Sequence, residues 1–289
     1  MNKNAKHLNI QTSKLHVLVT GANGMLGQDL CPILEDEGYE VFETDINNLD
    51  ITDFDMVKSV LETEKPDIVV HCAAYTNVDK AEEELETAKK INVQGTENLA
   101  KVCGENNITL VYISTDYVFD GELAKGSSYK PDDKTNPINN YGLTKLQGEE
   151  AVQKYCKKYY ITRTAWLYGI HGKNFVETMI SLADRPELKV VDDQVGCPTW
   201  TIELCNGIIK LLSEEKPYGI YHVCGGDKTS WYGFAKEIFK LAGLSVNLTP
   251  CTTEEFPRPA KRPRYSVMDN SGICRHWQRA LKDYISLRG

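Results

Sequence analysis

The chain has 289 residues, of which 41% are hydrophobic and 26% charged, the composition of an ordinary globular protein with one large domain or two modest ones. Its net charge of −8 provides no basic excess to neutralise phosphates, which argues against general nucleic-acid binding. No apolar run approaches the roughly 18 residues of a membrane span, so no membrane association is expected.

The chain begins with a polar segment and then a strand, a glycine-rich loop and a helix. Residues 1–13 lack the apolar core of a signal peptide and are predicted to form a flexible arm. A buried strand over 15–20 leads into Gly21, Gly24 and Gly27, and the following helix ends near residue 38. Glycines here permit close backbone approach, and a helix N-terminus favours an anion, so we predict a site for a dinucleotide pyrophosphate. The spacing is not the commoner G-x-G-x-x-G, and a plain glycine-rich turn is the alternative.

The second predicted strand, residues 40–45, ends in an acidic residue. Asp45 is placed to accept hydrogen bonds from the adenosine ribose and to repel a 2′-phosphate, which favours NADH while leaving NADPH open. A turn-forming aspartate before two asparagines is the alternative interpretation. Asp50 and Ile51, slightly further on, could lie along the adenine.

The third and fourth strands end in small or hydroxyl-bearing residues. After the strand over 67–72, Ala73, Ala74 and Tyr75 would let a cofactor pass close, although simple core packing explains them equally well. One long helix is predicted over 81–105. The strand over 109–114 is followed by Thr115, whose hydroxyl could donate to a substrate carbonyl oxygen.

A loop over 116–140 precedes a helix that begins with Tyr141 and carries Lys145 one turn later. Residues four apart share a helix face, so the two side chains should project together. A neighbouring ammonium is expected to lower the pKa of a phenol toward the working range of a proton donor. From spacing alone, an ordinary surface pair is the more common explanation.

Strand and helix alternate five times, with a last strand over 160–165, within about 150 residues. This alternation predicts an α/β fold with a Rossmann-type doubly wound parallel sheet over residues 14–165. After residue 165 the regular alternation of strand and helix ends. We predict helices over 175–183, 202–212 and 231–242 and a short strand over 189–191. We interpret residues 166–289 as a smaller C-terminal substrate-binding lobe, with a strand near 219–223 that could return to the main sheet.

Together, the glycine loop, the hydroxyl after the fourth strand and Tyr-x-x-x-Lys resemble the extended short-chain dehydrogenase/reductases. Further motifs resemble the dTDP-4-dehydrorhamnose reductase family, and the resemblance covers nearly everything from Val17 to Asp269: Ala73–Glu82, Ile91–Val93, Ser114–Gly121, Tyr141–Lys145, Arg163–Gly169, Asp193–Thr199 and Thr229–Tyr232. Tyr117 stands where related dehydratases usually carry a glutamate, which suits a reductase better.

The resemblance implies that NAD(P)H reduces the C4 ketone of dTDP-4-dehydro-L-rhamnose to dTDP-L-rhamnose for cell-surface polysaccharide. It implies catalysis by Thr115, Tyr141 and Lys145, and substrate contacts from Thr115, Asp116 and Trp166. The cofactor would be held by Gly21, Gly24, Met25, Leu26, Gly27, Asp45, Asp50, Ile51, Ala73, Ala74, Tyr75, Tyr141 and Lys145. A basic cluster, Arg258, Lys261, Arg262 and Arg264, is either a solvated tail or a contact for a diphosphate.

Two alternatives remain at this stage. One is a reductase or epimerase-reductase of another nucleotide sugar, and the other is a non-catalytic cofactor-binding subunit like that of methionine adenosyltransferase. A homodimer and a Mg²⁺ requirement are left open. Nine cysteines without a Cys-x-x-Cys pair and six histidines without metal-ligand spacing predict free thiols in a reducing cytoplasm and no metal site.

Overall fold

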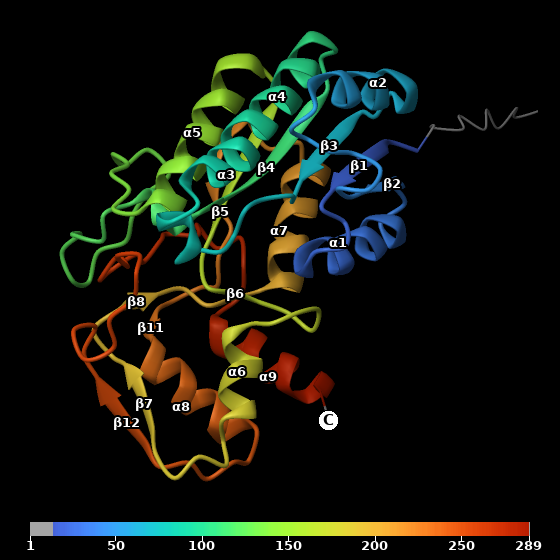
Figure 1. Ribbon diagram of the computed structural model, residues 1–289. Coiled ribbons are helices and arrows are strands. Elements are labelled where there is room, and N and C mark those ends of the chain that lie inside the picture. Colours follow the sequence, from blue (N-terminus) through green and yellow to red (C-terminus); the bar gives the residue numbers. More distant parts are fainter. Residues whose placement is uncertain (1–13, 289) are drawn as a thin grey trace, which may run out of the picture.

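The computed structural model describes residues 14–288, and a six-stranded parallel sheet lies at their centre (Figure 1). The predicted doubly wound α/β class is confirmed. Across the sheet the strands are β10 (Gly219–His222), β5 (Tyr159–Thr164), β4 (Thr109–Thr115), β3 (Ile68–His71), β1 (His16–Thr20) and β2 (Glu40–Thr44). The order reverses beside β1, and ligands of such sheets bind outside the strand carboxyl ends at that place.

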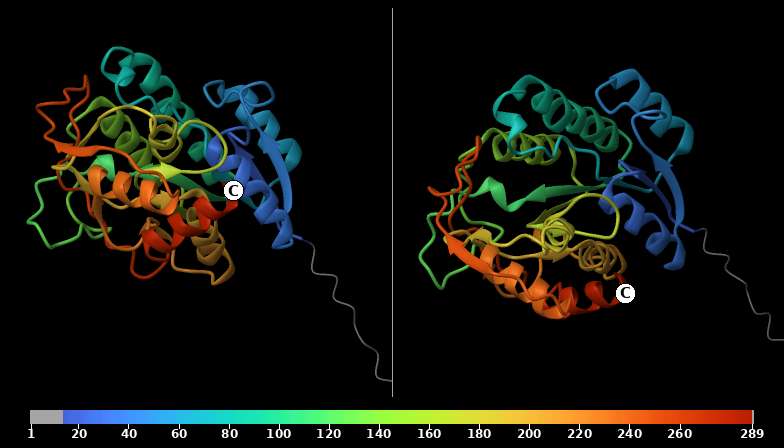
Figure 2. Two further views of the ribbon diagram at one scale, coloured as in Figure 1. Left: turned by 90° about the horizontal axis from the view of Figure 1, so that it is seen from below. Right: turned by 60° about the horizontal axis from the view of Figure 1, so that its bottom comes forward.

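Helices cover both faces of the sheet (Figure 2). On one face lie α1 (Met25–Asp36) and α7 (Thr201–Ser213), and on the other α2 (Phe54–Glu64), α4 (Thr96–Glu105) and α5 (Asn140–Tyr155). Successive strand residues point to opposite faces, so Val17 and Val19 pack with α1 while Leu18 packs with α2 and α4. Both faces are apolar, which is why the strands have nearly continuous hydrophobic sequences.

The single helix predicted over 81–105 is wrong, because the segment forms four pieces. These are η1 (Lys80–Glu82), α3 (Leu85–Lys89), the π-helical turn η2 (Lys90–Gly95) and α4. Asn92 lies in the widened turn and donates its side-chain amide to the Tyr75 carbonyl at 3.1 Å and the Thr144 hydroxyl at 3.1 Å. The π turn therefore connects the end of β3 with α5, a use typical of such turns at functional sites.

The remaining elements form a lobe below the sheet in Figure 1. It contains α6 (Phe175–Ser181), α8 (Trp231–Leu241) and α9 (Trp277–Arg288), with β7 (Leu188–Val191) paired to β12 (Leu248–Cys251). Two short pairs join the lobe to the sheet: β6 (Leu167–Tyr168) with β9 (Thr199–Trp200), and β8 (Val195–Gly196) with β11 (Thr229–Ser230). The sequence analysis did not predict α9 or β12.

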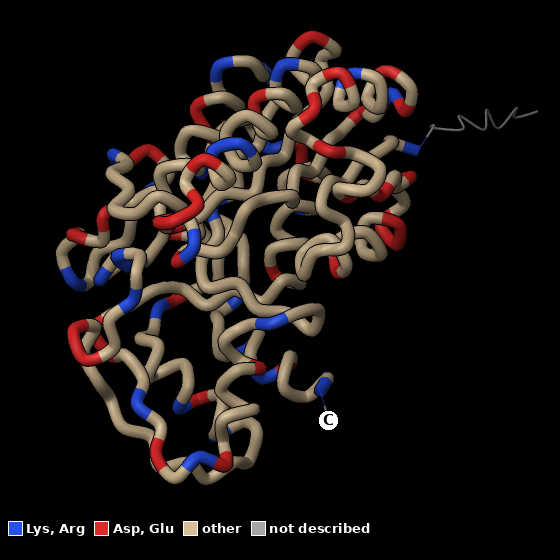
Figure 3. Tube along the Cα trace, in the orientation of Figure 1, with Lys and Arg blue, Asp and Glu red and all other residues tan. Residues whose placement is uncertain are grey.

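The division of the chain at residue 165 stays a prediction, and its N-terminal arm lies outside the described residues. β10 pairs in parallel with β5, and α7 packs on the sheet, although both follow the division. Acidic and basic side chains are interspersed along the described chain (Figure 3). Between residues 14 and 288, no helix is both long enough and apolar enough to cross a membrane.

Candidate active site

A cleft of about 800 Å³ opens at the carboxyl ends of the strands. Its walls come from the sheet edge, the first turns of α1 and α5, and the lobe. The cleft brings together every predicted site residue except Tyr75: Gly21, Gly24, Met25, Leu26, Gly27, Asp45, Asp50, Ile51, Ala73, Ala74, Thr115, Asp116, Tyr141, Lys145 and Trp166.

Tyr75 takes part in a neighbouring hydrogen-bond network. Its hydroxyl donates to the Glu84 carboxylate at 2.7 Å, and its backbone N–H donates to Asn92 at 2.8 Å. The bond to Glu84 holds the Tyr75 side chain away from the cleft. The predicted contact of Tyr75 with the cofactor therefore stays a prediction.

The glycine loop offers a backbone cradle at the start of α1. Gly21 has φ +67°, and a Cβ there would lie 2.7 Å from the Ala73 backbone nitrogen. Gly24 is the N-cap of α1 and provides no side-chain cap, and no acidic residue lies in the first turn. The first amides of this helix therefore have no intrahelical partner, and the first turn itself carries no negative charge, which fits a diphosphate.

Asp45 follows β2 beside this cradle. Its carboxylate accepts hydrogen bonds from the backbone N–H groups of Asn23 at 3.1 Å and Ile46 at 2.7 Å. Asp50 is held in the same way, because its carboxylate accepts from the backbone and hydroxyl of Thr52 at 2.9 and 2.8 Å, which lowers its pKa. Asp50 thus remains negatively charged at the adenosine end predicted for the cleft.

Local chain geometry fixes Tyr141 and Lys145 at the start of α5. Asn139 caps the helix by accepting from the Gly142 N–H at 2.7 Å. A Cβ on Gly142 would clash with the Tyr117 carbonyl, so only glycine lets the helix start this close to the turn that follows β4. The rings of Tyr117 and Tyr141 meet edge-to-face with centroids 5.8 Å apart.

The pKa values of Tyr141 and Lys145 differ from those that the sequence predicted. Burial raises the pKa of Tyr141 to about 12, with a smaller opposing effect from its hydrogen bond with Thr115. The predicted lowering by Lys145 is wrong here because burial dominates and the Lys145 ammonium lies 4.0 Å from the centroid of the Tyr112 ring. Burial also lowers the pKa of Lys145 to about 7, against the opposing charge of Glu149. Tyr141 is therefore a protonated phenol in the neutral range, as a proton donor must be.

Asp116 is buried next to Thr115 and receives two hydroxyl hydrogen bonds. Thr115 donates to it at 3.2 Å and Ser266 at 2.5 Å. Burial raises the pKa of Asp116 to about 7 in spite of these bonds. Ser266 was missed by the sequence analysis, since nothing in its local sequence places it beside a residue 150 positions earlier.

A buried ion pair connects α5 to the neighbouring strand β5. Glu149 accepts from Arg163 Nη2 at 2.7 Å and Nε at 2.9 Å, and from the Ser114 hydroxyl at 2.5 Å. Glu149 follows Lys145 by four residues and Tyr141 by eight, so one helix face carries all three. That spacing was visible in the sequence and could have identified Glu149.

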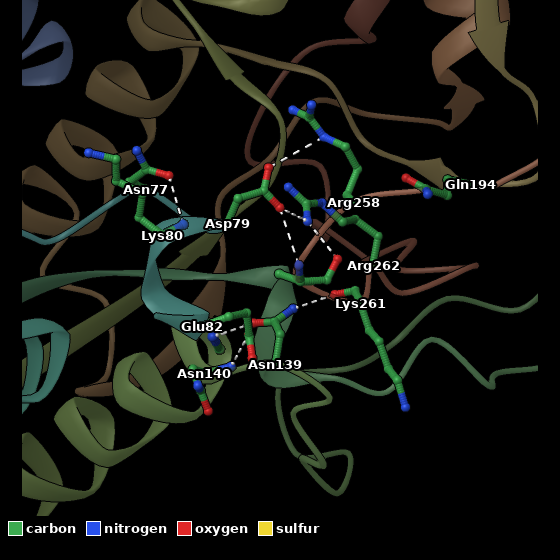
Figure 4. Close-up of polar contacts among 12 residues, drawn as sticks. Asn77, Asp79, Lys80, Glu82, Asn139, Asn140, Gln194, Arg258, Lys261 and Arg262 are labelled. Carbon is green, nitrogen blue, oxygen red and sulfur yellow. Dashed lines mark hydrogen bonds and ion pairs between the residues drawn. The ribbon is translucent and has the colours of Figure 1, made fainter. Parts of the chain in front are cut away.

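The basic cluster is partly neutralised inside the protein (Figure 4). Asp79 accepts from Arg262 at 2.6 Å and pairs with Arg258 at 3.3 Å. The Lys261 carbonyl accepts from Asn139, the N-cap of α5, at 2.8 Å. This segment therefore ties the C-terminal part of the chain to the start of α5.

The described residues contain no group of three or more His, Cys, Asp and Glu side chains that could hold a metal ion. A Mg²⁺ requirement therefore stays open.

Comparison with known proteins identifies the family. The RmlD substrate binding domain matches residues 15–287. The dTDP-4-dehydrorhamnose reductase of Streptomyces griseus is 44% identical, with 92% of this chain and 91% of that protein covered.

Two solved structures are similar over 95% of this chain and 99% of theirs. One is a dTDP-4-dehydrorhamnose reductase of Clostridium acetobutylicum, 48% identical with a TM-score of 0.92. The other is the dTDP-4-dehydrorhamnose reductase of Bacillus anthracis in complex with NADP, 42% identical with a TM-score of 0.91. The chain belongs to the dTDP-4-dehydrorhamnose reductase family.

Proposed function

We propose that this member of the dTDP-4-dehydrorhamnose reductase family reduces the C4 ketone of dTDP-4-dehydro-L-rhamnose to dTDP-L-rhamnose, a precursor of cell-surface polysaccharide. One observation carries the proposal: Thr115, Tyr141 and Lys145 line the same cleft as a glycine cradle, in a chain 44% and 48% identical to reductases of that name. The chain is thus an oxidoreductase acting on a nucleotide-sugar ketone.

The cofactor is NADH or NADPH, which supplies a hydride to the carbonyl carbon when bound. Gly21, Gly24 and the first amides of α1 would hold its diphosphate, and Asp45 its adenosine ribose. The carboxylate of Asp45 would repel a 2′-phosphate and supports a preference for NADH. The Bacillus anthracis relative was solved with NADP, so NADPH is an active second cofactor in this proposal.

The polar side chains at the sheet edge would handle the oxygen of the ketone. On substrate binding, the Thr115 hydroxyl would turn its proton from Asp116 to that oxygen and polarise the carbonyl. Tyr141, whose pKa burial raises to about 12, carries the proton that the developing alkoxide takes up. A group with a pKa that high releases its proton only to a stronger base, and an alkoxide is one. Lys145 would hold the nicotinamide ribose of the bound cofactor.

The substrate would be positioned by Asp116 and Trp166. The carboxylate of Asp116 accepts from the Ser266 hydroxyl, which fixes its direction before a sugar arrives. Trp166 provides an aromatic surface on the lobe side of the cleft. Together the two would set the sugar between the lobe and the hydride donor.

The test is oxidation of NADH and NADPH, followed in parallel, with freshly generated dTDP-4-dehydro-L-rhamnose. We expect turnover with both cofactors and a higher kcat/KM with NADH. Turnover only on dTDP-4-dehydro-6-deoxy-D-glucose would assign a different nucleotide sugar. Tight cofactor binding without turnover on either sugar would contradict the reductase proposal and favour a non-catalytic binding subunit.

Three further statements remain predictions. All nine cysteines are free thiols, which supports a reducing cytoplasm as the location. A homodimer would be tested by light scattering. A Mg²⁺ requirement would be tested by activity in the presence of a chelator.

A further inference from the structure

Trp166 occupies a backbone conformation that bulky residues rarely adopt. Its φ is +48°, in the left-handed region, where a tryptophan is strained unless its surroundings hold it. This residue lies two positions after the end of β5, directly before β6, and lines the cleft. Its strain therefore lies at the point where the sheet passes into the lobe.

A second tryptophan lies flat on the first. The ring centroids of Trp166 and Trp231 are 3.5 Å apart and the rings are inclined by only 4°. Aromatic pairs left to themselves prefer offset or edge-to-face arrangements, so a close face-to-face pair indicates that both rings are fixed from outside. Trp231 also lines the cleft, and Phe175 packs on it with centroids 4.5 Å apart.

A chain of hydrogen bonds holds Trp231 from its far side. Its indole N–H donates to Gln194 at 3.2 Å, and Gln194 donates to the Thr253 hydroxyl at 3.1 Å. Thr253 in turn donates to Asp193 at 2.7 Å. Gln194, labelled in Figure 4, is itself buried, so the indole cannot rotate without leaving a buried amide unpaired.

The other supports of the pair belong to the same small structural unit. A Cβ on Gly196 would lie 2.6 Å from the Trp166 ring, so the ring packs directly against the β8 backbone. β8 pairs with β11, and Ser230 of β11 caps the helix that Trp231 begins. Both indoles are thus positioned by the β8–β11 pair.

From this geometry we infer that Trp231 is a positioning residue for the nucleotide-sugar substrate, and that it holds the strained Trp166 ring against the sugar. The stacked indoles form a rigid apolar wall opposite the polar sheet edge, and the C–H face of a sugar ring is the ligand chemistry that fits such a wall. The inference rests on the proposed function, because it takes Trp166 to face the sugar. Trp231 itself takes no part in the reduction.

The experiment compares Trp231→Leu, Trp231→Phe and the matched control Trp277→Phe. Trp277 is buried in the lobe core and does not line the cleft. We expect Trp231→Leu to raise KM for dTDP-4-dehydro-L-rhamnose about 10-fold with kcat lowered less than about 3-fold and an unchanged Kd for NADH. Trp231→Phe, which keeps a stacking ring, should restore KM to within about 2-fold of wild type.

A spectroscopic measurement distinguishes the positioning role of Trp231 from a general disturbance of the fold. Coupling between the two stacked indoles should give a near-ultraviolet circular dichroism signal that both Trp231 variants lose and Trp277→Phe keeps. An unchanged KM in Trp231→Leu after this signal is lost would overturn the inference. So would a parallel loss of NADH affinity, which would indicate a disturbed fold.

A binding measurement makes the inference independent of turnover. Titration with dTDP-L-rhamnose, followed by quenching of tryptophan fluorescence, should give a Kd about 10-fold weaker for Trp231→Leu than for wild type. If wild type binds this nucleotide sugar but reduces no ketone, and Trp231→Leu binds it more weakly, the proposed function fails while the inference stands. If wild type turns over and Trp231→Leu binds equally well, the inference fails while the proposed function stands.

Discussion

The two walls of the cleft are built in different ways. The sheet wall carries Thr115, Tyr141 and Lys145 at the end of a regular strand and on the first turns of a regular helix. The lobe wall carries Trp166 and Trp231, which depend on irregular backbone and two-residue strands. The groups proposed to move protons thus lie on regular elements, while the groups proposed to recognise the sugar lie on a separately supported wall.

The walls also differ in chemistry, and the difference separates their expected effects. On the sheet wall, burial raises the pKa of Tyr141 and lowers that of Lys145. The lobe wall consists of a stacked indole pair whose polar edge is bonded to Gln194. Damage to the sheet wall should therefore reduce kcat or cofactor binding, and damage to the lobe wall should raise KM for the sugar.

The largest effect is expected when the Tyr141 hydroxyl is removed from the sheet wall. Tyr141→Phe should lower kcat by about 10³-fold, because the alkoxide loses its proton donor. The Kd for NADH should stay within about 2-fold of wild type, since the glycine cradle is untouched. Steady-state kinetics and a fluorescence titration with NADH measure the two effects, and unchanged turnover would remove Tyr141 from its proposed role.

The next largest effect is expected in the cradle itself. Gly21→Ala adds a Cβ that would lie 2.7 Å from the Ala73 backbone, at φ +67°. Strain of about 1–3 kcal/mol at this position should weaken NADH binding by about 10- to 100-fold and lower Tm. Gly243→Ala is a matched control, because its φ is +68° but a Cβ there meets nothing within 4 Å. Equal NADH affinity in the two variants would contradict the cradle.

A smaller effect concerns the choice between the two cofactors. Asp45→Ala removes the carboxylate beside the predicted adenosine ribose and with it the repulsion of a 2′-phosphate. The ratio of kcat/KM for NADH to that for NADPH should fall about 5- to 10-fold. Asp55→Ala, an exposed acid in the first turn of α2, is the control. A ratio that Asp45→Ala leaves unchanged would show that cofactor choice lies elsewhere.

The smallest effect is a pH dependence of stability that comes from Asp116. Its pKa is raised from 3.8 to about 7, so between these values the folded protein keeps a proton that the unfolded chain has lost. This contribution stabilises the fold at low pH and is lost as pH rises through about 7. The Tm of Asp116→Asn minus the Tm of wild type should therefore rise by at least about 2 °C between pH 5 and pH 8. A Tm difference that is constant with pH would contradict the raised pKa of the buried Asp116.

The sheet wall could be predicted from the sequence because its signals are local. Gly21, Gly24 and Gly27 lie within seven residues, and Tyr141 and Lys145 lie one helical turn apart. The strand–helix alternation then orders these motifs along one sheet edge, as observed. The π turn at Asn92 could not be predicted from local signals, because the spacing of apolar residues does not reveal one extra residue in a helical turn.

The lobe wall could not be predicted in the same way because its contacts are distant in sequence. Trp166 stacks on a residue 65 positions later, and Ser266 meets Asp116 across 150 positions. The direction of the pKa shift of Tyr141 was also missed, since spacing does not say how deeply a helix face is buried. Distant side-chain contacts and pKa shifts caused by burial follow from tertiary packing, which one sequence does not reveal.

The central claim is that this cleft transfers a hydride to C4 of the sugar, and isotopic labelling tests it most directly. The enzyme would be given dTDP-4-dehydro-L-rhamnose and NADH deuterated at the transferred position of the nicotinamide. We predict dTDP-L-rhamnose that is one mass unit heavier, with deuterium at C4 by NMR. Deuterium at another carbon, or an unlabelled product, would contradict the account.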